Sequence, residues 1–215
     1  MARKDFNKDS GFIQILDRCI AECPGREAIV FGDWRITYES FARYINMSAH
    51  MLAAAGIGKG DCVGIISRNR PEFLILEFSL YKLGAVPVKI NWRLAPGEMI
   101  MQLEASHVKT AFIQVENPDW GAQLFSHYAG ALSFFTFEGS GERDSSFIKL
   151  ISAYPDSEDF DVRLRDDAPA CHMHTSGTTG HAKTVVYTHG GMLDRFDSTL
   201  FIAPVVWAAV CGGLL

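Results

Sequence analysis

The sequence lacks any concentration of positive charge. Its 20 lysines and arginines are outnumbered by 25 aspartates and glutamates, the formal net charge is −5, and the basic residues are spread along the chain. Proteins that bind nucleic acid neutralise a run of phosphates with a basic stripe or patch. We therefore expect no nucleic-acid partner.

Long apolar runs are also missing. The first ten residues, MARKDFNKDS, carry charges with no apolar run behind them, so they do not form a secretory signal. The most apolar stretch, residues 200–215, contains Pro204 and falls short of the ~20 residues that a membrane-spanning helix needs. We expect no transmembrane span and a cytoplasmic location.

Cysteines are few and scattered, and the chain has no internal repeat or low-complexity tract. Only two of the five lie close together, and their four-residue spacing comes without a second pair or a following histidine cluster. This pattern argues against a zinc site and favours reduced thiols in a cytosolic protein. The five are Cys19, Cys23, Cys62, Cys171 and Cys211.

Ample core-forming material is present, since 48% of the residues are hydrophobic and 21% are charged. Helix and strand signals alternate along the chain, which predicts an α/β fold with a parallel sheet and helices on its faces. Residues 138–146 and 155–167 are polar and are expected to form surface connections. Expected strands cover 28–31, 35–37, 62–66, 85–90, 110–115 and 134–137, and expected helices follow Ser10 and Thr37 and cover 72–83 and 96–104.

Residues 174–184 read HTSGTTGHAKT, a composition suited to binding phosphate. Glycines allow positive φ and bring N–H groups close to an anion, hydroxyls donate to phosphate oxygens, and one threonine oxygen can face Mg²⁺. Lysine supplies a compact positive charge. The residues expected to bind are Thr175, Ser176, Gly177, Thr178, Thr179, Gly180 and Lys183, with Thr178 facing the metal.

Two alternatives compete for this loop. One is an ordinary flexible surface turn, since Ser, Thr and Gly are common loop residues. The other is the P-loop of a phosphotransferase, because residues 177–184 match G-x-x-x-x-G-K-[ST] except at Ala182. That motif must open a helix, whereas residues 185–187 are β-branched and aromatic. A hairpin loop between two strands fits the flanking residues better.

Segment 174–189, HTSGTTGHAKTVVYTH, resembles the T-S-G-[ST]-T-G-x-P-K-G signature of the AMP-forming acyl-CoA synthetases, which belong to the adenylate-forming superfamily. Three further segments resemble successive blocks of the same family in the right order. They are FGDWRITYESF at 31–41, AAGIGKGDCVGIISRNRPEF at 54–73 and YKLGAVPVKINWRLAPGEM at 81–99. The resemblance covers roughly residues 10–190, and Asn91–Leu94 leans toward acyl-CoA ligases.

The resemblance implies that the loop holds the β- and γ-phosphates of ATP and helps to place Mg²⁺. A substrate carboxylate, from a fatty or other acyl acid, would attack the α-phosphorus, and pyrophosphate would leave. The acyl group would then pass from AMP to the thiol of CoA, the co-substrate. No catalytic residue is assigned within this chain, and the oligomeric state is left open.

The sequence departs from the family pattern in two ways. Ala182 stands where the family has proline and Thr184 where it has glycine, and neither change removes the phosphate-binding groups. In addition, the family's later segments and C-terminal catalytic lysine cannot be placed in the residues beyond His189. We therefore expect layered sheets with flanking helices over residues 1–215, a truncated N-terminal part of the family's large domain without the C-terminal domain. A catalytically inactive remnant or interaction module is the alternative.

Overall fold

The computed structural model of the chain describes residues 11–114, 118–127, 133–137, 146–175 and 183–192. The helices are α1 (Phe12–Glu22), α2 (Tyr38–Ala54), α3 (Pro71–Leu83), α4 (Pro96–Ala105), α5 (Pro118–His127) and α6 (Ser146–Ile151). The strands are β1 (Glu27–Phe31), β2 (Trp34–Thr37), β3 (Cys62–Ile66), β4 (Val86–Ile90), β5 (Thr110–Gln114), β6 (Ser133–Phe137), β7 (Pro169–Thr175) and β8 (Lys183–Thr188).

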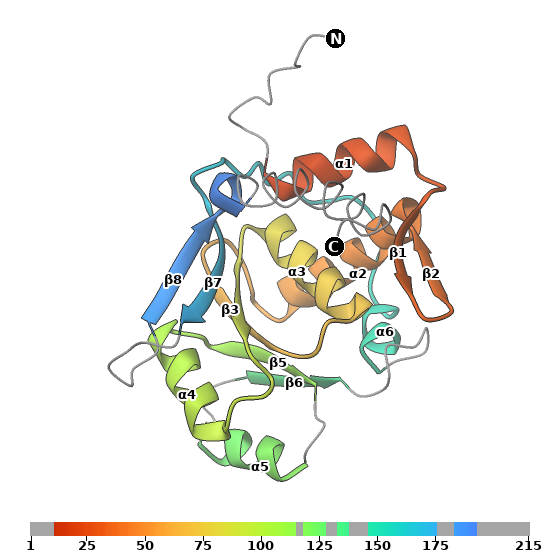
Figure 1. Cartoon of the computed structure of the whole chain (residues 1–215). Coiled ribbons are helices and arrows are strands. Elements are labelled where there is room, and N and C mark those ends of the chain that lie inside the picture. Colours follow the sequence, from red (N-terminus) through yellow and green to blue (C-terminus); the bar gives the residue numbers. More distant parts are fainter. Residues whose placement is uncertain (1–10, 115–117, 128–132, 138–145, 176–182, 193–215) are drawn as a thin grey trace, which may run out of the picture.

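A six-stranded sheet forms the centre of the molecule, with strand order β6-β5-β3-β4-β7-β8. Five strands run parallel and β8 is antiparallel to β7. Figure 1 shows α2 and α3 on one face of the sheet and α4 and α5 on the other. The expected α/β fold is therefore confirmed, and β1 and β2 form a separate antiparallel hairpin.

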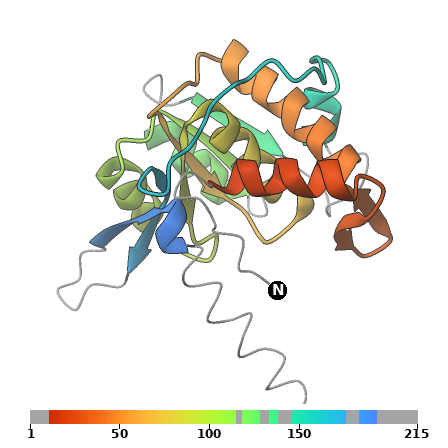
Figure 2. The ribbon, with the colours of Figure 1, turned by 90° about the horizontal axis from the view of Figure 1, so that it is seen from above.

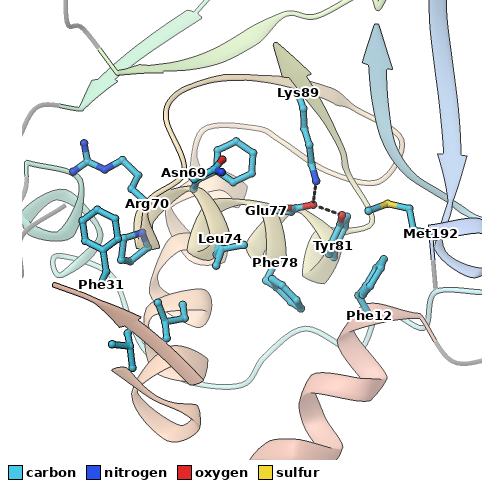
Figure 3. A pocket seen from close by; sticks show the side chains of 14 residues that line it. Phe12, Phe31, Asn69, Arg70, Leu74, Glu77, Phe78, Tyr81, Lys89 and Met192 are labelled. Atoms are coloured by element: carbon cyan, nitrogen blue, oxygen red, sulfur yellow. Dashed lines mark hydrogen bonds and ion pairs between the residues drawn. The ribbon is translucent and has the colours of Figure 1, made fainter. Parts of the chain in front are cut away.

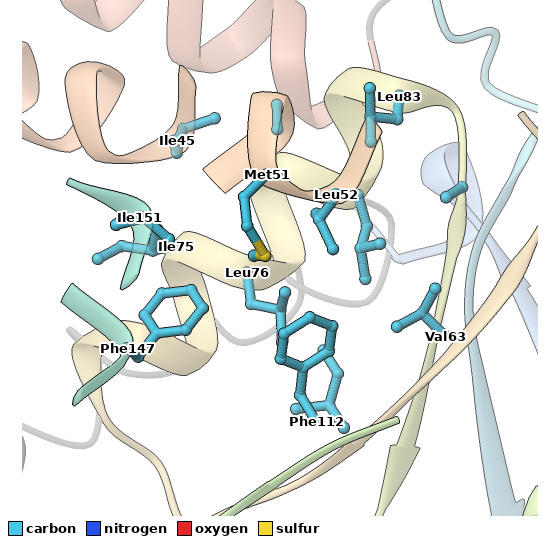
Figure 4. Close-up of a cluster of buried hydrophobic side chains, with 14 of the residues drawn as sticks. Ile45, Met51, Leu52, Val63, Ile75, Leu76, Leu83, Phe112, Phe147 and Ile151 are labelled. Carbon is cyan, nitrogen blue, oxygen red and sulfur yellow. The ribbon is translucent and has the colours of Figure 1, made fainter. Parts of the chain in front are cut away.

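The central strand β3 reads CVGII, and its apolar side chains are buried on both faces of the sheet. Ile65 packs with the α2 and α3 side chains, whereas Ile66 packs with Met99 and Leu103 of α4. Such continuous apolar sequence is typical of a strand covered by helices on both sides. Figure 4 shows the larger cluster, where Phe112 and helical side chains from α2, α3 and α6 meet.

The helix ends follow local sequence signals. Thr37 precedes α2, and its Oγ1 accepts a hydrogen bond from the Ser40 backbone N–H at 3.2 Å, as expected for a helix cap. Pro71 occupies the first turn of α3, and Gly84 ends this helix with a φ of 69°. The expected cap of α1, Ser10, lies outside the described residues, and the helix follows Gly11.

The connection at 155–167 is more firmly attached than its polar sequence indicated. Arg43 Nε donates to Asp156 Oδ2 at 2.7 Å, and Asn46 Nδ2 donates to the Asp156 carbonyl at 2.9 Å. Lys82 Nζ pairs with Glu158 at 2.5 Å. Figure 2 shows this segment running beside α2. These contacts make it a strap across α2 and α3.

Two helices, α5 and α6, were not expected from the sequence. Of residues 138–146, expected to form a surface connection, 138–145 lie outside the described residues and Ser146 begins α6. The apolar stretch 200–215 also lies outside the described residues. Within the described ranges, no helix is both long and apolar enough to cross a membrane.

Candidate functional site

The predicted phosphate-binding loop connects two antiparallel strands, β7 and β8. Thr175 pairs with Lys183 and His174 pairs with Thr184 in this hairpin. The hairpin expectation is therefore confirmed. The P-loop alternative is wrong, because the chain after Lys183 continues as a strand and cannot place a helix N-terminus at the phosphates.

The described part of the chain contains two of the seven predicted site residues, Thr175 and Lys183. Both are exposed and lie at the open end of the hairpin. Their side chains are therefore accessible to a ligand in solvent. The other five lie outside the described residues: Ser176, Gly177, Thr178, Thr179 and Gly180. The expected metal ligand, Thr178, is one of them.

The base of the hairpin is held by His189, which is fully buried. Its Nδ1 accepts a hydrogen bond from the Phe12 backbone N–H at 3.5 Å, and its ring lies 4.9 Å from the Tyr81 ring. Burial lowers the pKa of His189 to about 4. The imidazole is therefore neutral near pH 7, and it ties the hairpin to α1 and α3 in a structural role.

His172 and His174 alternate along β7, and neither forms part of a metal centre within the described residues. His174 Nε2 lies 3.3 Å from Ser106 Oγ, while His172 lines a cavity of about 630 Å³. Burial lowers the pKa of both imidazoles. His172 is thus a cavity-lining residue, whereas His174 contacts the residue that follows α4.

A cationic cluster at the carboxyl edge of the sheet was not anticipated from the sequence. The Arg68 guanidinium lies 4.3 Å from the Trp92 ring centroid and that of Arg93 lies 5.0 Å from it. Arg68 follows β3, and both Trp92 and Arg93 follow β4. Open α/β sheets bind ligands outside the carboxyl ends of their strands, so arginines placed directly after buried strands were the available signal.

This carboxyl edge is also the edge at which the predicted phosphate-binding loop begins and ends. β7 runs parallel to β4, so Thr175 at the end of β7 lies at the same end of the sheet as residues 91–93. Ser67 Oγ donates to Gln114 Oε1 at 3.0 Å, and this hydrogen bond links the ends of β3 and β5. The arrangement favours a polyanionic ligand at this end.

Comparison with known proteins supports this interpretation. YdaB of Bacillus subtilis (strain 168), which is assigned as an acyl–CoA ligase, is 31% identical over 166 residues, covering 77% of this chain and 33% of YdaB. A medium/long-chain-fatty-acid–CoA/3-oxocholest-4-en-26-oate–CoA ligase of Mycobacterium marinum (strain ATCC BAA-535 / M) is 28% identical over 81% of this chain and 33% of its own length. The chain thus spans about a third of these relatives.

A solved structure shows the same fold. The N-terminal subdomain of NpsA from Klebsiella oxytoca, in complex with 3-hydroxybenzoyl-AMSN, matches with a TM-score of 0.67 and 26% identity, covering 83% of this chain and 41% of NpsA. The family model described as AMP-binding enzyme matches residues 16–210. The chain therefore belongs to the AMP-binding enzyme family.

Proposed function

We propose that this chain is the ATP-binding front part of an acid–CoA ligase, with residues 174–184 as its triphosphate-binding loop. The observation that carries the proposal is the hairpin register, which sets Thr175 opposite Lys183 at the two ends of a segment rich in Ser, Thr and Gly. A hydroxyl and an ammonium group therefore flank the loop where phosphate oxygens would enter.

In this proposal, Lys183 stabilises the negative charge that develops on the departing pyrophosphate. The hydroxyls of Thr175, Ser176, Thr178 and Thr179 donate to the β- and γ-phosphate oxygens, and the backbones of Gly177 and Gly180 bring N–H groups close to them. Donors that are in place before a reaction need not reorganise as charge moves from the α-phosphorus to the leaving group.

Mg²⁺ fits this site as a phosphate-bound ion. The described residues hold no cluster of acidic or histidine ligands, and Thr175 and Lys183, the described residues on either side of the loop, are both exposed. Mg²⁺ commonly keeps several waters and binds substrate phosphates with few protein ligands. We assign its one hydroxyl ligand to Thr178. When bound, the ion supplies charge neutralisation on the triphosphate.

The proposed reaction has two balanced steps. A carboxylate oxygen attacks the α-phosphorus. The bond between the α-phosphorus and the oxygen that bridges the α- and β-phosphates breaks, and pyrophosphate leaves. The CoA thiol then gives up its proton to water, its sulfur attacks the acyl carbonyl carbon, the carbon–oxygen bond to AMP breaks, and AMP leaves. The exposed cations Arg68 and Arg93 increase the local concentration of such polyanionic substrates at this edge of the sheet.

We propose a fatty or other acyl acid as the substrate, and the relatives support the broader class. The Mycobacterium marinum protein is named for fatty acids, and the NpsA subdomain was solved with a 3-hydroxybenzoyl compound. We also propose a cytoplasmic location, since the four described cysteines are all free thiols.

The test is carboxylate-dependent ATP–pyrophosphate exchange by the 215-residue chain with a panel of fatty and aromatic acids. Lys183→Ala should abolish the exchange, whereas Lys149→Ala, which removes an exposed lysine from α6, should preserve it. Circular dichroism checks that both variants fold.

Binding of a fluorescent ATP analogue separates the remaining outcomes. Binding that needs Lys183, without exchange, would support the phosphate loop and require the rest of the ligase for chemistry. A folded chain that shows neither exchange nor Lys183-dependent binding would support the alternative, an inactive remnant or interaction module.

A further inference from the structure

A cavity of about 580 Å³ lies between α1, β1 and α3 (Figure 3). Aromatic and aliphatic side chains form most of its wall, including Phe12, Phe31, Leu74 and Phe78. Leu74 is 37% exposed, so this part of the wall is open to solvent. Cavities of this size and lining are typical of small-molecule sites.

One side of this cavity carries a buried polar group, the Glu77 carboxylate, which is 5% exposed. Tyr81 Oη donates to Glu77 Oε1 at 2.5 Å, and Lys89 Nζ approaches the same oxygen at 2.5 Å. Burial, together with the adjacent carboxylate, raises the pKa of Tyr81 well above its usual value. The phenol therefore remains a donor, and Glu77 is held in one orientation.

This polar group retains hydrogen-bonding capacity. Both contacts of Glu77 use Oε1, and Oε2 has no hydrogen-bond partner within the described part of the chain. Lys89 has three N–H donors, of which Glu77 occupies one. The cavity thus presents an acceptor and donors side by side.

The pair selects ligands by hydrogen bonding. A carboxylate could accept from Lys89 but could not donate to Oε2, whereas an ammonium group could donate to Oε2 but could not accept from Lys89. A primary carboxamide offers an N–H to Glu77 and a carbonyl oxygen to Lys89. The surrounding aromatic side chains suit a flat apolar body.

We propose that this cavity is a second ligand site, which binds small uncharged molecules with an aromatic body and a carboxamide end. The site does not depend on the proposed ligase function, because none of its lining residues belongs to the phosphate-binding loop.

The first experiment measures calorimetric binding of three matched probes to the 215-residue chain without ATP. The probes are 4-phenylbenzamide, 4-phenylbenzoate and 4-phenylbenzylamine, which share one body and differ in the polar end. The amide should bind about tenfold more tightly than either ion, since each ion loses one of the two hydrogen bonds. Equal affinities for the three, or no saturable binding of the amide, would overturn the proposal.

The second experiment uses variants to locate the site. Leu74→Trp places a large side chain in the cavity and should abolish amide binding, whereas Met101→Trp, at a 48% exposed position on α4, should not affect it. Lys89→Met should reduce the preference for the amide over the amine about tenfold. Lys183→Ala should leave amide binding unchanged. A failure of the proposed nucleotide site is therefore distinguishable from a failure of the proposed amide site. Unchanged amide binding by Leu74→Trp would exclude this cavity.

Discussion

Thr175 and Lys183 lie directly opposite each other in the antiparallel register of β7 and β8. Residues 176–182 therefore begin and end at adjacent points on the sheet, and the strand pair fixes both ends of the loop. A P-loop holds phosphate at the start of a helix, whereas here the loop is closed by a ladder of strand hydrogen bonds. The residues proposed to bind phosphate therefore have a different supporting structure from those of a P-loop.

Restoring the family glycine at position 184 should weaken the hairpin. Thr184 pairs with His174 inside the strand ladder, and it is not among the described residues with positive φ. The tolerance of glycine for positive φ is therefore not needed at this position. Glycine has a lower β-strand propensity than threonine, and it increases the conformational entropy of the unfolded chain. Thr184→Gly should lower the free energy of unfolding by about 0.5–1 kcal/mol, measured by urea denaturation. A gain in stability would contradict the strand conformation.

A methyl group at Gly64 should be costly because the sheet and α4 meet there. An added Cβ would lie 2.7 Å from Leu103 Cδ2 and 3.1 Å from Ala111 Cβ. Gly64→Ala should destabilise the fold by about 1–3 kcal/mol, as overpacked cores do. Gly97→Ala is the matched control, since nothing lies within 4 Å of its added Cβ and it sits in α4. Thermal unfolding of the two variants should shift in opposite directions.

The buried ion pair at the start of α3 should be sensitive to loss of one charge. Arg70 donates from Nε to Glu72 Oε2 at 2.8 Å and from a terminal nitrogen to Oε1 at 2.7 Å, and both side chains are almost fully buried. Glu72→Gln should lower the free energy of unfolding by about 3–5 kcal/mol, because the buried Arg70 side chain keeps its positive charge and loses the negative charge of Glu72.

Asp167→Asn breaks an exposed pair with Arg165 and provides the comparison for Glu72→Gln. This change should cost less than about 1 kcal/mol. Chemical denaturation of both variants would measure the contrast, and similar losses would show that burial does not govern these pairs.

Acid should destabilise the fold partly through His189. Burial lowers its pKa to about 4 in the folded chain, compared with about 6.5 when unfolded. Between these values the unfolded chain binds a proton that the folded chain does not, so stability rises with pH across this window. The contribution is complete above pH 6.5, and about 3 kcal/mol is lost as pH falls to 4.

Denaturation at a series of pH values would test the role of His189. His189→Gln should reduce the slope of stability against pH between 4 and 6.5 by up to one proton. The remaining slope includes His172 and His174, whose pKa values burial also lowers. An unchanged slope in the variant would show that His189 is not the titrating group.

Local signals in the sequence identified most of the secondary structure. The side-chain cap at Thr37, proline in the first turn of α3 and glycine after it each act within a few residues, so they could be read directly. The uninterrupted apolar sequence of β3 likewise indicated a buried strand. Helix α6 was missed because its six residues are too few to show a clear helical period.

Relationships between distant residues could not be predicted in this way. The place of β3 between β4 and β5 depends on how helices cover the sheet, and no local pattern records it. The contacts of the Glu77 carboxylate depend on Tyr81 of the same helix and on Lys89 of β4, the next strand. The hairpin was predicted because both of its strands flank the loop directly, whereas Arg68 and Trp92 meet only after folding.

The strap across α2 also has a consequence for synthesis of the chain. Arg43 and Asp156 are separated by 113 positions in the sequence. At about 5–20 residues per second, the ribosome needs roughly 6–23 seconds to add that length. During this interval α2 can pack on α3 but lacks its outer covering, so the nascent chain exposes a helix face that only later translation closes.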